Sequence, residues 1–236
     1  MRILLVKTSS LGDVIHNLPV VSDIRRHFPD AEIDWCVEES FAAIPRLHPG
    51  VREVIPVAIR RWRKQLTKTA TWREIAAFRQ QIAAKPYAAV IDTQGLVKSA
   101  LLARRAKGPR LGYAADSARE PLAARCYDRT FHIARDLHAV VRNRLLAAAA
   151  LGYATAGEPD YGIDTVPGAF PWLPHRPYVV FLTATSRDDK LWPETNWLAL
   201  GRHLNGLGFS CVLPGGSAVE RERASRLASA IPGAVV

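Results

Sequence analysis

The sequence predicts an α/β protein made of two doubly wound units, of which the second is incomplete. Short apolar runs alternate with amphipathic segments, which predicts parallel sheets whose strands are joined by right-handed helical crossovers. The alternation stops once, in residues 152–174, where Gly, Pro, Ala and Asp are frequent, and then starts again. A chain of 236 residues is long enough for one large domain or two small ones.

Five apolar runs predict the strands of the first unit, at 2–7, 32–37, 51–56, 87–92 and 110–113. Runs of this kind are typical of parallel strands that are buried on both faces. The intervening helices are expected at 14–28, 40–47, 72–84, 95–106 and 137–151.

Two of these helices carry further signals. Asn17 is a candidate N-cap for the first helix, and Pro19 lies close to its start, where proline is tolerated. In the third helix Ile75, Phe78 and Ile82 recur at helical spacing, so one face of that helix is apolar.

The second unit has fewer elements than the first. Strands are expected at 178–182 and 209–213, and helices at 194–207 and 219–230. Residues 231–236 look like the entry into a further strand, so we expect the chain to be C-terminally truncated. The expected division is a first unit at 1–155, a linker at 156–175 and a partial second unit at 176–236.

Composition excludes several classes of protein. Hydrophobic residues make up 48% and charged residues 23%, as in globular proteins rather than disordered or collagen-like chains. Cys36, Cys126 and Cys211 are scattered and form no CxxC, which argues against a disulfide framework and favours a reducing cytosol. No apolar run is long enough for a membrane span, and the N-terminal run is too short for a signal peptide.

The net charge of +10 is concentrated in one part of the chain. Residues 51–150 hold 20 Lys and Arg against 7 Asp and Glu, an excess of 13, whereas residues 151–236 hold 7 against 8. Such a block indicates an anionic partner: nucleic acid, a membrane surface, or a phosphorylated or carboxylated ligand.

The first loop, residues 8–13, follows the first predicted strand at the sheet edge where α/β proteins bind ligands. Asp13 lies there, either as a functional carboxylate or only as a residue that stabilises the start of the next helix. The loop is not GxGxxG, and the chain has no GxxxxGK[ST], so neither a dinucleotide site nor a P-loop is supported.

Basic residues follow other predicted strands of the first unit. Four cations occupy five positions at 60–64, which indicates either an anion site or a solvated surface. Lys98 lies in the first turn of a helix, where a cation opposes the helix dipole, and this mildly favours a ligand role. Arg119 adds a further cation in an irregular stretch.

Polar loops also follow both strands of the second unit. Residues 183–190 combine hydroxyls with Lys190 ahead of a helix and could hold phosphates. Glu220 could bind ribose hydroxyls or simply favour the N-terminus of its helix. The seven histidines show no HExxH and the chain has no Asp-x-Asp, so no metal site is expected.

Five blocks, taken together, carry a family resemblance: MRILLVKTSSLGDVIHNLPVVSDIRRHFP, VIPVAIRRWRK, AVIDTQGLVKSALLARR, SAREPLA and ATSRDDKLWPETNW. In this order and spacing they closely resemble the lipopolysaccharide heptosyltransferase I family. The resemblance implies a GT-B fold of two Rossmann-like domains, in which residues 1–155 would be the acceptor-binding domain and residues 176–236 a partial donor-binding domain. The family continues with an Asp-Thr-Gly-x-x-His segment that helps to hold the donor diphosphate and has no counterpart here.

The resemblance also implies roles for individual residues. Asp13 matches the catalytic base and Lys190 the lysine that contacts the donor diphosphate. Thr185 and Ser186 match donor-phosphate hydroxyls, and Glu220 matches an acid that binds the adenosine ribose. A larger set matches the acceptor-binding surface: Ser10, Arg60, Arg61, Arg63, Lys64, Gln94, Lys98 and Arg119.

The activity implied is inverting transfer of heptose from ADP-L-glycero-D-manno-heptose to a Kdo sugar of Kdo2-lipid A, with no obligatory cofactor. The enzyme is expected in the cytoplasm, peripheral on the inner membrane, whose anionic surface would attract the basic block. One alternative is a nucleic-acid-binding protein, suggested by a pI of 9.9 but without any nucleic-acid-binding motif. Another is a non-catalytic chain that binds an anionic acceptor but holds ADP weakly.

Overall fold

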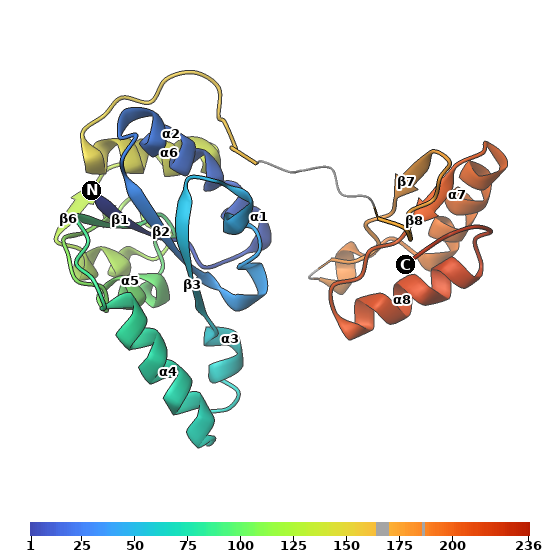
Figure 1. Ribbon diagram of the computed structural model, residues 1–236, viewed down its shortest axis with the longest axis horizontal. Helices are drawn as coiled ribbons and strands as arrows, with labels where there is room; N and C mark the ends of the chain where they lie inside the picture. Colours follow the sequence, from blue (N-terminus) through green and yellow to red (C-terminus); the bar gives the residue numbers. More distant parts are fainter. Residues whose placement is uncertain (164–169, 186) are drawn as a thin grey trace. The chain divides into compact units, whose positions relative to one another are not determined.

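The computed structural model describes residues 1–163, 170–185 and 187–236, and it divides the chain into two compact units, Met1–Thr165 and Val166–Val236 (Figure 1). The predicted α/β class is confirmed. The boundary between the units falls inside the predicted linker, while the acceptor and donor roles given to the units stay predictions.

A parallel sheet of six strands forms the centre of the first unit, in the order β3-β2-β1-β4-β5-β6. This is the strand order of the Rossmann fold, in which the first strand lies in the middle of the sheet. The strands are β1 (Arg2–Val6), β2 (Glu32–Glu38), β3 (Val51–Val57), β4 (Ala89–Asp92), β5 (Arg110–Tyr113) and β6 (Arg129–Phe131).

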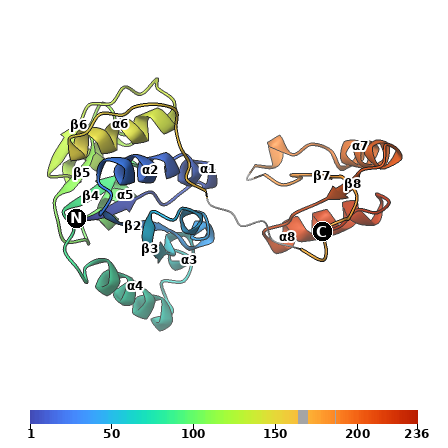
Figure 2. The same ribbon diagram turned by 45° about the horizontal axis from the view of Figure 1, so that its top comes forward.

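Helices cover both faces of this sheet (Figure 2). Ile3 and Leu5 of β1 pack on the face covered by α2 and α6, whereas Leu4 and Val6 pack on the face covered by α3, α4 and α5. Because both faces are covered, β1 is apolar at every position from 3 to 6. The helices are α1 (Leu11–Ile15), α2 (Leu18–His27), α3 (Ile59–Trp62), α4 (Thr69–Ile82), α5 (Val97–Ala103) and α6 (Ala139–Leu151).

Four local features differ from the sequence predictions, and one of them is the short helix α3, where no helix was expected. The helix expected at 14–28 is broken into α1 and α2, and Asn17 caps α2 without a side-chain hydrogen bond. The helix expected at 40–47 is two short 3₁₀ segments, Glu39–Phe41 and Pro45–Leu47, with Pro45 interrupting a continuous helical ladder. Strand β6 was not predicted at all, because it has only three residues and two of them are polar.

The second unit is a smaller α/β layer. Strands β7 (Tyr178–Val180) and β8 (Ser210–Val212) pair in parallel, and helices α7 (Glu194–Gly206) and α8 (Ala218–Ser229) follow them. Its core contains Phe181, Leu213, Leu227 and Ile231. The segment expected to enter a further strand forms a parallel bridge between Val212 and Val235.

None of the helices in the described part of the chain is both long enough and apolar enough to cross a lipid bilayer.

Candidate active site

The candidate site lies where the strand order of the first unit reverses. From β1 the chain continues to β2 on one side, whereas from β4 it continues to β5 on the other. The loops that leave β1 and β4 therefore diverge, and the crevice between them is where open α/β sheets bind ligands. Residues 7–10 and 93–96 form these two loops.

A small cavity of about 70 Å³ opens beside these loops. It brings together three of the predicted site residues, Asp13, Gln94 and Arg119. The other residues that line it were not predicted as site residues; they are Lys7, Thr93, Tyr113, Ala139, Arg142 and Asn143.

Asp13 lies half-buried in the first turn of α1. Its Oδ2 accepts hydrogen bonds from the Ser10 backbone N–H at 2.8 Å and from the Ser10 hydroxyl at 3.0 Å. Burial raises the pKa of Asp13, but the Ser10 hydrogen bonds and the charge of Lys7 outweigh burial, so the pKa lies below its usual value. The carboxylate is thus ionised at neutral pH, and one oxygen makes both helix-capping contacts.

Lys7 is the buried cation of the cavity and is only 5% exposed. Its Nζ donates to the Thr93 carbonyl at 2.8 Å and to Asn143 Oδ1 at 3.4 Å. Burial lowers the pKa of Lys7 to about 8, although Asp13 and Asp92 act in the opposite direction. From the sequence, Lys7 was only the last residue of a strand, and a lone lysine at a strand end carries no pattern.

Gln94 is buried, and its side chain binds the neighbouring loop. Its Oε1 accepts from the backbone N–H groups of Thr8 and Ser9, and its Nε2 donates to the Ser9 carbonyl. Asp92 in turn accepts from the backbone N–H of Gln94 at 2.8 Å. Gln94 therefore holds the wall of the cavity in place; the acceptor contact predicted for it stays a prediction.

Helix α6 supplies Arg142 and Asn143 to the cavity. Its position is fixed by a buried ion pair in which Arg144 Nε lies 2.7 Å from Asp23 Oδ2 on α2. Arg144 also donates to the carbonyls of Ala156 and Gly157. Helix α6, which carries three of the cavity residues including Ala139, is thus held against its neighbour α2 on the same sheet face.

Two further predicted acceptor residues lie close to this cavity. Ser10 is exposed and bound to Asp13. Lys98, in the first turn of α5, extends its Nζ to 3.3 Å from the Ser9 hydroxyl. Burial raises the pKa of the Glu38 carboxyl group at the end of β2, and the positive charge of Lys98 acts against this rise.

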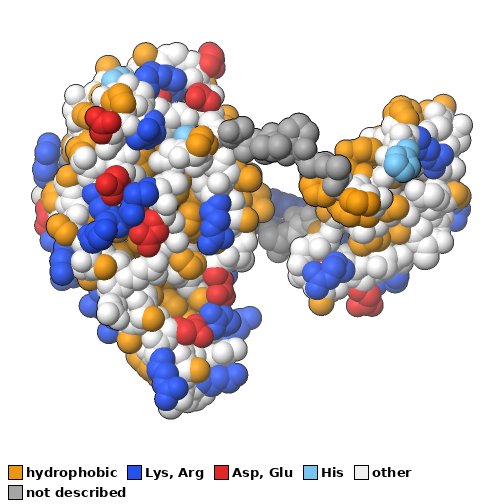
Figure 3. All heavy atoms as spheres, in the orientation of Figure 1, with side chains coloured by type: hydrophobic (Ala, Val, Ile, Leu, Met, Phe, Trp, Pro, Cys, Tyr) orange, Lys and Arg blue, Asp and Glu red, His pale blue; other side chains and the backbone are white. Residues whose placement is uncertain are grey.

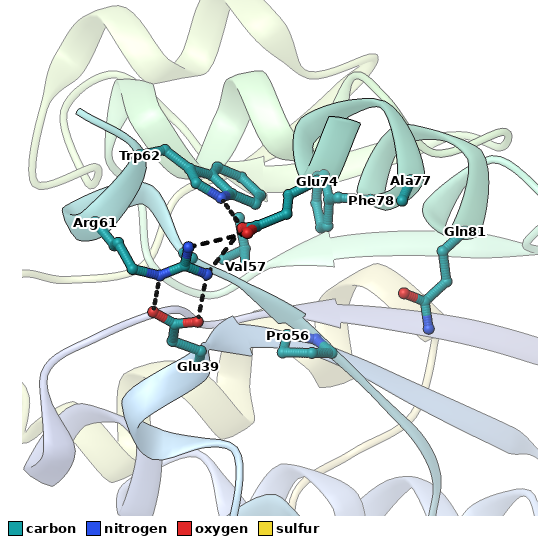
Figure 4. Close-up of a pocket in the computed structure, with 10 residues that line it drawn as sticks. Glu39, Pro56, Val57, Arg61, Trp62, Glu74, Ala77, Phe78 and Gln81 are labelled. Carbon is teal, nitrogen blue, oxygen red and sulfur yellow. Dashed lines mark hydrogen bonds and ion pairs between the residues drawn. The ribbon is translucent and has the colours of Figure 1, made fainter. Parts of the chain in front are cut away.

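The basic cluster at 60–64 lies around α3 and does not line the Asp13 cavity. Arg61 is held by carboxylates of the chain itself: Glu39 accepts from two of its nitrogens at 2.9 and 3.0 Å, and Glu74 lies 2.8 Å away (Figure 4). Arg61 and both acids line a separate cavity of about 240 Å³. Arg60, Arg63 and Lys64 are exposed, and Lys and Arg side chains gather at this end of the unit (Figure 3).

The donor residues predicted in the second unit are only partly described. Thr185 and Lys190 are exposed, and Ser186 lies outside the described residues. Glu220 accepts from the backbone N–H groups of Ser217 at 2.8 Å and Gly216 at 3.0 Å, so it caps α8. The hydrogen bond from Ser217 is the main cause of its lowered pKa. Within the described ranges, no three His, Cys, Asp or Glu side chains are grouped as metal ligands.

A family model matches the larger part of the chain. The model for glycosyltransferase family 9 (heptosyltransferase) matches residues 75–236, which is more than half of the chain. The chain belongs to glycosyltransferase family 9.

Individual members of glycosyltransferase family 9 match a longer part of this chain than the family model does. Lipopolysaccharide heptosyltransferase 1 of Pseudomonas aeruginosa is 50% identical over 100% of this chain and 67% of its own length. The solved structure of the E. coli heptosyltransferase WaaC with ADP is 48% identical, with a TM-score of 0.89 over 100% of this chain and 74% of that chain. The same enzyme with ADP-2-deoxy-2-fluoro heptose is 47% identical, with a TM-score of 0.89 over 100% and 76%.

These comparisons confirm the predicted family and the predicted class of enzyme. They favour a glycosyltransferase over the nucleic-acid-binding alternative, since the match extends over the whole chain. The fold class is confirmed as well, because the parallel α/β architecture superimposes on a solved family member.

Proposed function

We propose that this protein transfers heptose from ADP-L-glycero-D-manno-heptose to a Kdo sugar of Kdo2-lipid A, with inversion at the anomeric carbon. The donor is supported by the family member solved with ADP-2-deoxy-2-fluoro heptose, and the acceptor by the resemblance to heptosyltransferases I.

The observation that carries the proposal is an ionised carboxylate, Asp13, beside a cavity at the topological switch point. Asp13 uses one oxygen for Ser10, and its other oxygen is available to a substrate hydroxyl. In the proposed step the acceptor oxygen bonds to the anomeric carbon, its proton passes to Asp13, and the bond from that carbon to ADP breaks. A base in this position typically contributes 10²–10⁴-fold.

The departing ADP carries the negative charge that the reaction generates. Lys190 is the cation proposed to stabilise it, with the hydroxyls of Thr185 and Ser186 as further donors. Preorganised charge of this kind stabilises the transition state more than the substrate. No metal ion is assigned a part in this scheme.

The test is to incubate the purified chain with ADP-heptose and Kdo2-lipid A, and to measure both ADP release and the mass of the lipid product. Release of ADP together with a lipid heavier by one heptose supports the proposal. ADP release without a heavier lipid would indicate hydrolysis instead, and no release would reject the activity for this chain.

We also propose that the enzyme works on the cytoplasmic face of the inner membrane, held there peripherally. The supporting feature is an apolar groove of about 210 Å³ lined by residues of α3, α4 and α5, where Leu101 is 47% exposed and Arg79 and Arg105 are among the lining residues. Each Lys or Arg near an anionic bilayer contributes about 1 kcal/mol. Co-sedimentation with phosphatidylglycerol vesicles but not with phosphatidylcholine vesicles is expected; equal recovery with both would reject this location.

A further inference from the structure

The cavity that Asp13 lines has an excess of positive charge over negative charge. Three cations line it, Lys7, Arg119 and Arg142, against one carboxylate, Asp13. Asp92 is the nearest other acid to Lys7, but it is fully buried and its oxygens accept from the backbone of residues 94 and 95 and from the Tyr127 hydroxyl. Even with Asp92 ionised, positive charge is in excess.

The cations also have hydrogen-bond donors to spare. A lysine ammonium has three, and Lys7 uses two, on the Thr93 carbonyl and on Asn143. Arg142 donates from Nη2 to the Ser117 carbonyl and lies over the Tyr113 ring, while its Nε is buried without a partner among the described residues. Arg119 makes no side-chain hydrogen bond to any residue that the structure describes.

A third, independent sign of a missing ligand is Thr93. Its side chain is 1% exposed and lines the cavity, yet its hydroxyl has no hydrogen-bond partner in the described part of the chain. A buried hydroxyl left without a partner costs about 1–3 kcal/mol, so native proteins normally satisfy it.

We propose that this cavity is a carboxylate-binding subsite, in which Lys7, Arg142 and Thr93 hold the acid group of the acceptor sugar while Arg119 covers it from the open side. The inference rests on the proposed function, because it takes the acceptor to be an acidic sugar. The group of that sugar which is recognised is then its carboxylate, and it lies in the cavity that Asp13 also lines.

The size of the cavity supports a small anion. A space of about 70 Å³ holds a group of a few atoms, since one water molecule occupies about 30 Å³ of liquid. The carboxylate would anchor the sugar inside the cavity, and the hydroxyl to be glycosylated would remain at its mouth beside Asp13. A sugar without the acid group would lose this anchor and with it the alignment of the hydroxyl.

The experiment compares two ligands that differ only in the acid group, the methyl glycoside of Kdo and its carboxyl methyl ester. Their affinities are measured by calorimetry on the full chain, without donor or turnover. The wild-type protein is expected to bind the acid roughly tenfold or more tightly than the ester, as for one charged hydrogen bond.

Two variants then locate the effect. Lys7→Met removes the buried charge at similar length, and Arg119→Gln changes an exposed side chain with little risk to folding. Both are expected to bring the acid-to-ester ratio towards one. The matched control is Arg46→Met, which removes an exposed cation of the same unit that does not line the cavity and should keep the wild-type ratio.

Equal affinities of the wild type for acid and ester, no measurable binding of the acid at millimolar concentration, or an unchanged ratio in a folded Lys7→Met and in Arg119→Gln would each overturn the subsite. Turnover of Kdo2-lipid A, measured separately, decides the proposed function. If the chain prefers the acid to the ester but transfers no heptose, the subsite stands and the proposed activity is rejected. If it transfers heptose but binds acid and ester equally, only the subsite is rejected.

Discussion

Gln94 and Ser9 hold each other by two hydrogen bonds: Gln94 Nε2 donates to the Ser9 carbonyl at 2.6 Å, and the Ser9 N–H donates to Gln94 Oε1 at 3.1 Å. This side chain therefore acts as a short piece of β-ladder beyond the ends of β1 and β4. It joins the two loops that form the candidate active site.

Gln94→Glu should weaken this connection, because the new carboxylate cannot donate to the Ser9 carbonyl and would face it directly. Leaving that carbonyl without a donor is expected to lower the free energy of unfolding by about 1–3 kcal/mol. Urea unfolding measures the change, and Gln80→Glu on the exposed side of α4 is the matched control. A loss no larger than that of the control would contradict the proposed role of Gln94.

Asp13→Asn should abolish most of the transfer activity, since the amide retains the size of the side chain but cannot take a proton. The expected loss in kcat is about 10²–10⁴-fold, with nearly unchanged ADP affinity and thermal stability. Initial rates under saturating substrates and ADP calorimetry provide the two measurements. A variant that retains more than a tenth of the wild-type turnover would leave Asp13 with only its capping role.

Lys7 should make acceptor binding weaken as the pH rises. Its pKa of about 8 in the folded protein means that the ammonium is lost above this pH, so KM for the acceptor is expected to rise there. The pH profile of KM, measured on the wild type and on Lys7→Met, tests this. If the rise persists in Lys7→Met, another group is responsible.

A rise in pH should increase the contribution of Lys7 to the stability of the folded protein, although it weakens acceptor binding. Between about pH 8 and the ordinary lysine pKa of 10.5, the unfolded chain holds a proton that the folded chain has lost. The contribution of Lys7 to stability therefore rises with pH across this window. The change in the free energy of unfolding between about pH 8 and pH 10.5 should therefore be smaller in Lys7→Met than in the wild type.

Arg63 and Lys64 are exposed and outside the Glu39–Arg61–Glu74 ion pairs, so they are the members of the basic cluster best able to attract a distant anion. Replacing both with Ala should raise the acceptor KM several-fold at low salt and less at high salt, because exposed charges are screened. The KM for the donor should stay within about twofold if the cluster serves the acceptor. Equal losses for both substrates would assign the cluster to folding instead.

Glu220 offers a test between two roles. Glu220 is the N3 residue of the capping box of α8, so its replacement by Ala should reduce stability by about 0.3–1.5 kcal/mol. Its replacement by Gln should cost less, since the amide oxygen still accepts. If it also binds ribose, both variants should weaken ADP. Loss of stability without loss of ADP affinity would restrict Glu220 to capping.

Most elements could be predicted because each one buries an apolar face. The strands β1 and β4 are buried on both faces, so apolar residues follow one another without a break from 3 to 6 and from 89 to 91. The failures have local causes: β6 pairs at the edge of the sheet with Arg129 and Thr130 largely exposed, and the turn at His16 and Asn17 splits a segment of continuous helical periodicity.

The cavity was only half predictable. Asp13 and Arg119 match site residues of the family, but Lys7 and Arg142 meet only because β1 and α6, which are more than 130 residues apart, are neighbours in the fold. Lys7 has an unusual pKa because its side chain is buried, and the residue type alone does not show this burial. The side chains of Gln94 and Glu220 accept hydrogen bonds from backbone N–H groups, and the ligand contacts predicted for both stay predictions.

The central position of β1 has a consequence during protein synthesis. Its residue Ile3 pairs with Ile33 on one side but with Ala89 on the other, so the second partner leaves the ribosome 86 residues later. At about 5–20 residues per second, that delay is about 4–17 s. For this time an apolar strand has an open edge, so the nascent chain should depend on a holding chaperone until β4 has emerged.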